Sequence, residues 1–189
     1  MGEELRLFIA IELEDLIKEK LEKIKNILRD CSLEIKWVDK CNLHLTLKFL
    51  GEVNVDNIDA IEQKLLALKG EVDKFDIRIK GLGAFPNLDY PKVIWTGIDD
   101  GQENLKKLQQ LLEDSMLDLG FKAEAHSYLP HITLGRTGRK EKNFTLISKR
   151  IKEFPFEIDC KQQVNKISLM KSRLTPKGVV YNSLFEVEF

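Results

Sequence analysis

The sequence predicts an α+β fold with two lobes related by a pseudo-twofold axis, with antiparallel sheets that face a central groove and helices on the outside. A His-apolar-Thr-apolar pattern occurs twice, at residues 44–47 and 131–134. Apolar runs typical of strands alternate with amphipathic helical segments in the same order in both halves. The spacing from Ile11 to the first of these histidines and from Ile98 to the second is 33 residues in both cases. These observations indicate an internal repeat.

The length and composition of the chain fit a single domain. It has 189 residues, of which 43% are hydrophobic and 32% are charged, which is enough apolar material for one sizeable core. We therefore expect one two-lobed domain over residues 1–189. Its approximate repeats would cover 5–83 and 92–170, and a last strand would cover 179–189.

The first half has the pattern of strand, helix, histidine strand, helix and strand. Leu5 to Ile11 form a short apolar run, and residues 15–28 place their apolar side chains on one helical face. The strand that carries the first histidine ends at Gly51. The next expected elements are a helix at 54–69, a strand at 75–80 and a turn-rich surface loop at 81–91.

The same order returns in the second half. Residues 93–98 are expected to form a strand, and residues 104–119 a helix that ends at Gly120. The strand with the second histidine follows Pro130. The remaining expected elements are a helix at 143–152 and strands at 156–159, 164–170 and 179–189.

Charge and cysteine content limit the possible binding partners and the cellular compartment of the protein. Thirty basic and 31 acidic residues give a net charge of -1, which argues against long duplex DNA or RNA as a ligand. The three cysteines form no CxxC pair, so we expect reduced thiols in a cytoplasmic protein. No apolar run approaches the length of a membrane span, and the N-terminus lacks the apolar region of a signal peptide. We expect a monomer that does not bind membranes.

The two patterns place catalytic groups on one face of each strand. Successive side chains of a strand point to opposite faces, so His44 and Thr46 share a face, as do His131 and Thr133. Two histidines across a groove can act as acid and base near neutral pH, because the unperturbed pKa of histidine is about 6.5. The threonine hydroxyls can donate hydrogen bonds to phosphate oxygens in the transition state. This set favours cleavage of a phosphodiester without a metal ion or other cofactor.

Other interpretations of the same residues have less support. Two amphipathic strands with a solvated polar face would not need a repeated histidine. Two histidines could hold a metal ion, but the sequence has no His-Glu-x-x-His motif, no paired cysteines and no acidic cluster near either histidine. A P-loop and a Gly-x-Ser-x-Gly motif are also absent. A phosphodiesterase with two histidines remains the best interpretation.

Several segments carry a family resemblance that covers nearly the whole chain. They are Arg6 to Ile11, Trp37-Val38, Asn42 to Gly51, Gly81 to Pro86, Pro130 to Arg136, and the Ser-x-Leu-x-Pro-x-Gly pattern at residues 172–178. With these segments the sequence resembles the RNA 2′,3′-cyclic phosphodiesterases, also called 2′-5′ RNA ligases, of the two-histidine phosphoesterase superfamily. One departure is Gly135, where the family often has Ala, a difference that we expect to matter little.

The resemblance implies a two-lobed fold that hydrolyses RNA 2′,3′-cyclic phosphate ends, including ends derived from tRNA, to 2′-phosphomonoesters without a metal ion. It implies that His44 gives a proton to the departing 3′ oxygen and that His131 takes a proton from water. The sequence symmetry alone does not assign these roles. The reverse reaction would join RNA ends through a 2′-5′ linkage. The alternative function is a non-catalytic module that binds RNA ends in the same groove.

Some residues near the patterns are weaker candidates for substrate binding. Lys48 has the strand parity to face the groove with His44, although a solvated Lys is an equal alternative. Arg136 matches an Arg of the family motif, but parity places it opposite to His131 unless Gly135 introduces a bulge. For four aromatic residues, core packing is the better interpretation than stacking on a base, and these are Phe8, Phe49, Phe85 and Tyr128. His126 is expected in a loop.

Overall fold

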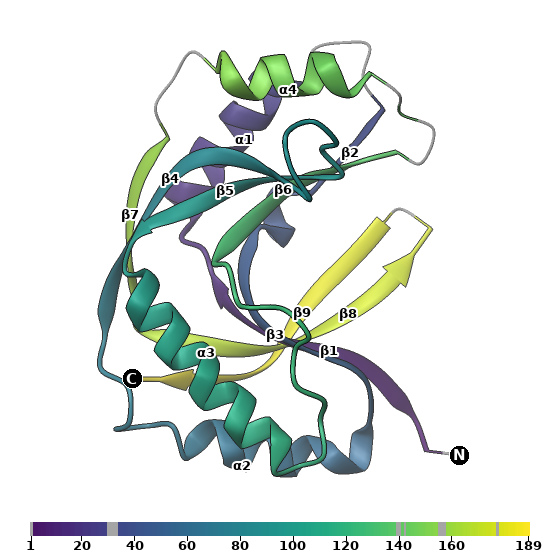
Figure 1. The fold of residues 1–189 in the computed structure, drawn as a ribbon. Coiled ribbons are helices and arrows are strands. Elements are labelled where there is room, and N and C mark those ends of the chain that lie inside the picture. The colour runs from purple at the N-terminus through teal and green to yellow at the C-terminus, as the bar shows by residue number, and fades with distance from the viewer. Residues whose placement is uncertain (1, 30–33, 139–140, 142, 155–157, 177) are drawn as a thin grey trace.

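The computed structural model describes residues 2–29, 34–138, 141, 143–154, 158–176 and 178–189. Within these residues one curled antiparallel sheet has the strand order β7-β4-β5-β6-β3-β1-β8-β9, and β2 pairs with β6 beside this path (Figure 1). The strands are β1 (Glu4–Glu12), β2 (Ile35–Trp37), β3 (His44–Asn54), β4 (Phe75–Phe85), β5 (Val93–Asp100), β6 (His131–Thr137), β7 (Asp159–Val164), β8 (Lys166–Thr175) and β9 (Gly178–Glu188). The predicted α+β class with two halves around a groove is confirmed.

The two halves of the sheet exchange strands. One half contains β1, β3, β8 and β9, and the other contains β4, β5, β6 and β7, so β4 of the first repeat lies among strands of the second. The halves meet where β3 pairs with β6, at Leu45 and Ile132. Each half of the sheet therefore combines strands from both repeats of the chain. The groove is enclosed by one bent sheet.

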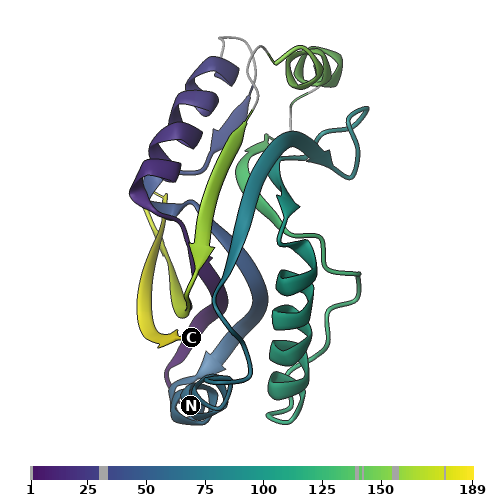
Figure 2. The same ribbon diagram turned by 90° about the vertical axis from the view of Figure 1, so that its left-hand side faces the viewer.

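Helices cover the outer side of both halves. They are α1 (Asp15–Leu28), α2 (Ile58–Leu66), α3 (Gln102–Leu117) and α4 (Phe144–Lys152), and short 3₁₀ turns precede β3 (Lys40–Asn42) and α2 (Val55–Asn57). Figures 1 and 2 show α1 and α4 at one end of the molecule and α2 at the other. Helix α1 buries Ile17 and Leu21, and α3 buries Leu105, Leu108 and Leu112. None of the helices among the described residues is long and apolar enough to cross a lipid bilayer.

Most predicted elements have counterparts, but strand β2 and most of β7 were not predicted, one predicted loop is wrong in part, and one predicted strand is untested. Residues 81–85, predicted as part of a surface loop, continue strand β4 and pair with β5. Gly83, one of the two glycines in this segment, makes room for the large side chain of Trp95 on β5. The strand predicted at 156–159 lies mostly outside the described residues, and β7 begins at Asp159.

The equal spacing of 33 residues does not mark equivalent positions. In β1, Ile11 pairs with Leu45, the residue that follows the first histidine of the repeated pattern. In β5, the residue that pairs with Ile132 is Thr96 and not Ile98. The two repeats have the same order of strands. The pairing of β1 with β3 and the pairing of β5 with β6 nevertheless differ in register by two residues. The repeat limits of 5–83 and 92–170 stay a prediction.

Candidate active site

The two His-x-Thr segments cross at the centre of the sheet. Leu45 and Ile132 are fully buried and lie directly opposite each other on β3 and β6. The flanking histidines and threonines point to the other face, where all four side chains line one groove of about 390 Å³ that is open to solvent. Because the pairing is antiparallel, His44 lies toward Thr133 and Thr46 lies toward His131. The structure thus brings the two histidines and two threonines together.

Backbone carbonyls fix the tautomer of both histidines. Nδ1 of His44 lies 2.7 Å from the carbonyl oxygen of Asn42, and Nδ1 of His131 lies 2.8 Å from that of Leu129. A carbonyl only accepts, so Nδ1 donates in both cases and Nε2 is the nitrogen left to accept or give up a proton. Nε2 of His44 lies 2.9 Å from the hydroxyl oxygen of Thr46.

Aromatic rings hold each imidazole in place. The ring of His44 lies 4.9 Å from Phe8 and 5.2 Å, edge to face, from Tyr181. The ring of His131 lies 4.9 Å, edge to face, from Phe85 and 6.3 Å from Trp95. Phe8 is buried as expected and Phe85 is half-buried, and both pack against a histidine, whereas the core position expected for Phe49 is wrong because its side chain is 59% exposed. Ring contacts of this kind restrict rotation and exclude water from one side of each imidazole.

Gly83 creates the space for one of these rings. It lies opposite Trp95 on β4 and β5, and a Cβ added at Gly83 would come within 2.3 Å of the indole. Gly135 has a similar role on β6, because an added Cβ would lie 2.9 Å from the ring of Trp37. The substitution of Ala for Gly135 would thus require a neighbour to move, contrary to the expectation that the difference matters little.

The charges around the two histidines differ. Burial lowers the pKa of His44, while the carbonyl of Asn42 and the carboxylate of Glu12 act in the opposite direction. Burial also lowers the pKa of His131, which the carbonyl of Leu129 opposes and the Arg136 guanidinium lowers further. A positive charge on His131 lowers the pKa of His44 as well, because the two like charges repel.

A β-bulge follows the threonine of each pattern and decides which side chains reach the groove. Opposite β1, Leu47 is left out of the register between Thr46 and Lys48. Opposite β5, Leu134 is left out between Thr133 and Gly135. Each bulge reverses the parity of the following residues. Phe49 and Arg136, the fifth residue after each histidine, therefore line the groove.

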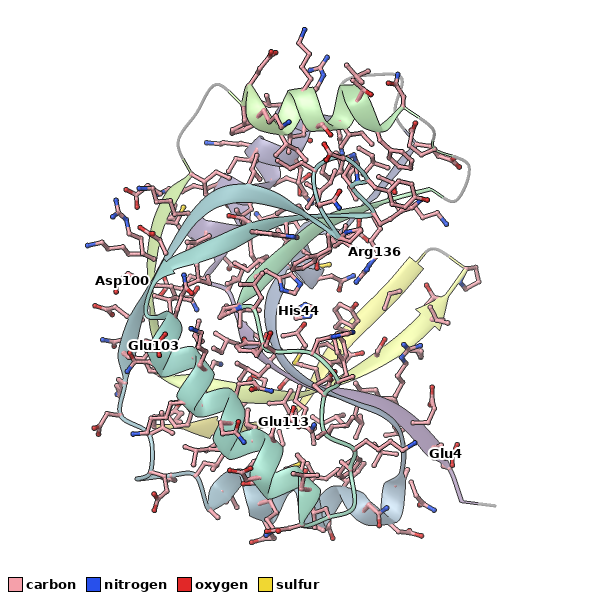
Figure 3. The ribbon with its side chains drawn as sticks, in the orientation of Figure 1. Glu4, His44, Asp100, Glu103, Glu113 and Arg136 are labelled. Carbon is pink, nitrogen blue, oxygen red and sulfur yellow. The ribbon has the colours of Figure 1, made fainter. Side chains whose placement is uncertain are left out.

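The prediction that Lys48 faces the groove is wrong. Its side chain is fully buried, and Nζ lies 2.6 Å from a carboxylate oxygen of Glu113 on α3. Nζ also donates to the carbonyl oxygen of Lys122, at 3.0 Å. The bulge at Leu47 turns Lys48 away from solvent and toward the helix. Figure 3 shows His44 and Arg136 between the two halves of the sheet, and Glu113 on α3.

Other groove residues were not predicted from the sequence as site residues. The hairpin of β8 and β9 contributes one wall, and the amide of Asn42 donates to the carbonyl of Val179 at 2.7 Å, which ties this wall to the start of β3. The Ser-x-Leu-x-Pro-x-Gly pattern was the signal for this wall. Groove residues outside the predicted set include Arg6, Asn42, Ser172, Leu174, Val179 and Tyr181.

The remaining candidates lie elsewhere. The hydroxyl of Tyr128 donates to the carbonyl of Thr46 at 3.1 Å, which supports β3 from behind, and His126 is exposed in an irregular segment. Cys41 and Cys160 are free thiols, and Cys31 lies outside the described residues. Among the residues that the structure describes, no three His, Cys, Asp or Glu side chains gather closely enough to bind a metal ion.

A two-part curled sheet with a His-x-Thr strand from each part on one groove defines a class of phosphoesterases. The sequence model described as LigT like Phosphoesterase matches this chain twice, at residues 11–95 and 97–181. The chain therefore belongs to the LigT-like phosphoesterase family. Membership of this family makes it a hydrolase.

Similar proteins agree with this assignment. An RNA 2′,3′-cyclic phosphodiesterase of Methanocaldococcus jannaschii is 34% identical over 96% of this chain and 99% of its own. One of Archaeoglobus fulgidus is 34% identical over 95% of this chain and 98% of its own. The crystal structure of TT0787 of Thermus thermophilus superposes with a TM-score of 0.81 at 25% identity, over 97% of each chain.

Proposed function

We propose that this chain hydrolyses the 2′,3′-cyclic phosphate at RNA ends to a 2′-phosphomonoester, without a metal ion or another cofactor. The observation that carries the proposal is the crossing of the two His-x-Thr segments at Leu45 and Ile132, with all four polar side chains on one groove. The relatives named as RNA 2′,3′-cyclic phosphodiesterases support the same substrate.

The reaction needs one proton to be taken and one to be given. Nε2 of His131 takes a proton from a water molecule as its oxygen forms a bond to phosphorus. The bond from phosphorus to the 3′ oxygen breaks, and Nε2 of protonated His44 gives its proton to that oxygen. The Thr46 and Thr133 hydroxyls donate to the non-bridging oxygens, where negative charge builds up. Proton exchange with water then restores both histidines.

Arg136 belongs to the same proposal as a substrate-binding residue. It is exposed at the groove, close enough to His131 to affect its pKa. A guanidinium there can bind the phosphate through two parallel hydrogen bonds.

In the reverse reaction, the same groups would join a 5′-hydroxyl RNA end to a cyclic phosphate through a 2′-5′ linkage. We further propose a cytoplasmic monomer that acts on ends such as those of cleaved tRNA.

The deciding experiment is turnover of cytidine 2′,3′-cyclic phosphate in EDTA, with the product identified by phosphorus NMR. We expect cytidine 2′-monophosphate to accumulate at the same rate with and without chelator. Binding of the cyclic nucleotide without turnover would instead identify a module that holds RNA ends. Activity lost in EDTA and restored by zinc would overturn the metal-free mechanism.

A further inference from the structure

The groove extends beyond the catalytic residues to a second cationic point. Arg6 on β1 and Ser172 on β8 are direct cross-strand partners, and both line the groove. The Arg6 side chain is exposed, and in the described part of the chain it forms no ion pair. Its other cross-strand neighbour, Glu52 on β3, does not line the groove. The guanidinium is therefore available to an anionic ligand.

The backbone of Arg6 lies well along β1 from the level of the catalytic threonine Thr46. Thr46 pairs with Ala10, and four residues of extended strand separate Ala10 from Arg6, which is about 13 Å. Arg136 already provides a guanidinium beside His131. The groove thus has one arginine at the reaction centre and another at a distance from it.

An aromatic surface lies between these two arginines. Phe49 is 59% exposed and lines the groove, with its ring 6.2 Å from Phe8. Tyr181 lies within the electrostatic range of both Arg136 and Arg6. A flat apolar surface between two cations matches a base and ribose between two phosphates, because every base can stack on an aromatic ring.

We infer that Arg6 and Ser172 bind the phosphodiester on the 5′ side of the terminal nucleotide while its base stacks on Phe49. In an RNA end the terminal nucleotide carries the cyclic phosphate on its 3′ side and this phosphodiester on its 5′ side. A free nucleoside 2′,3′-cyclic phosphate has only the first. The inference, which rests on the proposed function, makes the enzyme selective for RNA chain ends over free cyclic nucleotides.

The test compares cytidine 2′,3′-cyclic phosphate with the same molecule that carries an added 5′-phosphate. A charge-assisted hydrogen bond contributes about 1.5–3 kcal/mol, so the 5′-phosphate should raise kcat/KM roughly 10- to 100-fold. In Arg6→Gln this ratio should fall close to one. In Arg173→Gln, which removes the same charge from an exposed residue of β8 outside the groove, the ratio should stay at the wild-type value. High salt should reduce the wild-type ratio.

Binding measurements separate this inference from the proposed function. Calorimetry with cytidine 2′-monophosphate and cytidine 2′,5′-bisphosphate needs no turnover. Tighter binding of the bisphosphate that depends on Arg6 would support the subsite even if the cyclic phosphate were not hydrolysed. Equal binding of the two ligands by the wild type, or an unchanged preference in Arg6→Gln, would overturn the inference while turnover of the cyclic nucleotide could still stand.

Discussion

Glu12 on β1 is the direct cross-strand partner of His44 on β3, and its carboxylate raises the pKa of that histidine against the effect of burial. A hydrogen bond of 2.8 Å from the Ser168 hydroxyl holds the carboxylate. The corresponding partner of His131 is Gly97, which has no charge, and Arg136 lowers the pKa of His131. This asymmetry supports His44 as the acid and His131 as the base.

The first prediction concerns the variant Glu12→Gln, which removes the carboxylate and retains its shape. The pKa of His44 should fall, because burial, His131 and Lys18 would then be opposed only by the Asn42 carbonyl. His44 would then lose its catalytic proton at lower pH, and the alkaline limb of the activity profile should move to lower pH. NMR titration of the histidine ring protons measures this directly.

The same spectra contain a control for this variant. Glu12 is not among the groups that shift the pKa of His131, so the His131 titration should stay in place. A His44 titration that does not move in Glu12→Gln would contradict the account of the asymmetry. Movement of both titrations by the same amount would indicate a general disturbance of the groove.

The second prediction concerns the four polar groups at the crossing. Replacement of either His44 or His131 by Ala should lower kcat by roughly 10²- to 10⁴-fold, because each removes a proton-transfer group. Thr46→Val and Thr133→Val should each lower kcat by up to roughly 10²- to 10³-fold, because each removes a hydrogen-bond donor to the charge that develops on the phosphate oxygens. Steady-state kinetics measures these losses, and circular dichroism checks that the fold is intact. Near-normal activity of one histidine variant would rule out the paired acid and base.

The sequence predicted the parts of this structure that depend on local patterns. Apolar spacing placed a helix at 15–28, which are the limits of α1, and alternation placed each His and Thr on one face of a strand. The prediction failed where the outcome depends on distant partners. The alternation of side chains between the two faces predicts their direction only while strand pairing is uninterrupted. The bulges at Leu47 and Leu134 are set by the pairing with β1 and β5, which the local sequence does not show.

Strand exchange explains the groove residues that were missed. Arg6, Ser172 and Tyr181 reach the groove because β8 and β9, from the end of the chain, pair beside β1. No local pattern around Arg6 or Tyr181 contains that information. The two histidines also have different cross-strand partners, Glu12 for His44 and Gly97 for His131. The equal spacing of the repeats in the sequence does not predict this difference, because the second strand pairing is shifted by two residues.

The third prediction follows from the burial of Lys48. Lys48→Met leaves the Glu113 carboxylate buried beside only the amide of Gln109, which donates to it at 2.8 Å. Removal of one partner of a buried ion pair costs about 3–5 kcal/mol, which urea denaturation would measure as a loss in the free energy of unfolding. The kcat/KM of the folded variant should change little, because Lys48 does not line the groove.

Two further variants control for this loss of stability. Lys107→Met removes an exposed lysine of α3 and should change stability by less than about 0.5 kcal/mol. The double variant Lys48→Met with Glu113→Gln should recover part of the loss, because no unpaired charge remains buried. A large rise in KM for Lys48→Met without a loss of stability would restore the original interpretation of Lys48 as a substrate-binding residue.

The fourth prediction tests whether Gly83 supports the catalytic geometry from a distance. In Gly83→Ala the new Cβ would overlap the indole of Trp95, which lies 5.1 Å from the ring of Phe85 and 6.3 Å from that of His131. Overpacking of this kind costs about 1–3 kcal/mol of stability. Displacement of the rings around His131 should also lower kcat by roughly 10- to 100-fold, since small misplacements of a catalytic group are costly.

A second substitution distinguishes the steric effect from a general loss of structure. The contacts of the added Cβ are with atoms of the six-membered ring of Trp95 and its junction with the pyrrole, which a smaller phenyl ring does not occupy. Gly83→Ala combined with Trp95→Phe should therefore recover both stability and kcat relative to Gly83→Ala alone. If the double variant is as impaired as the single one, the cause lies in the backbone of β4 and not in the packing of Trp95 against the site.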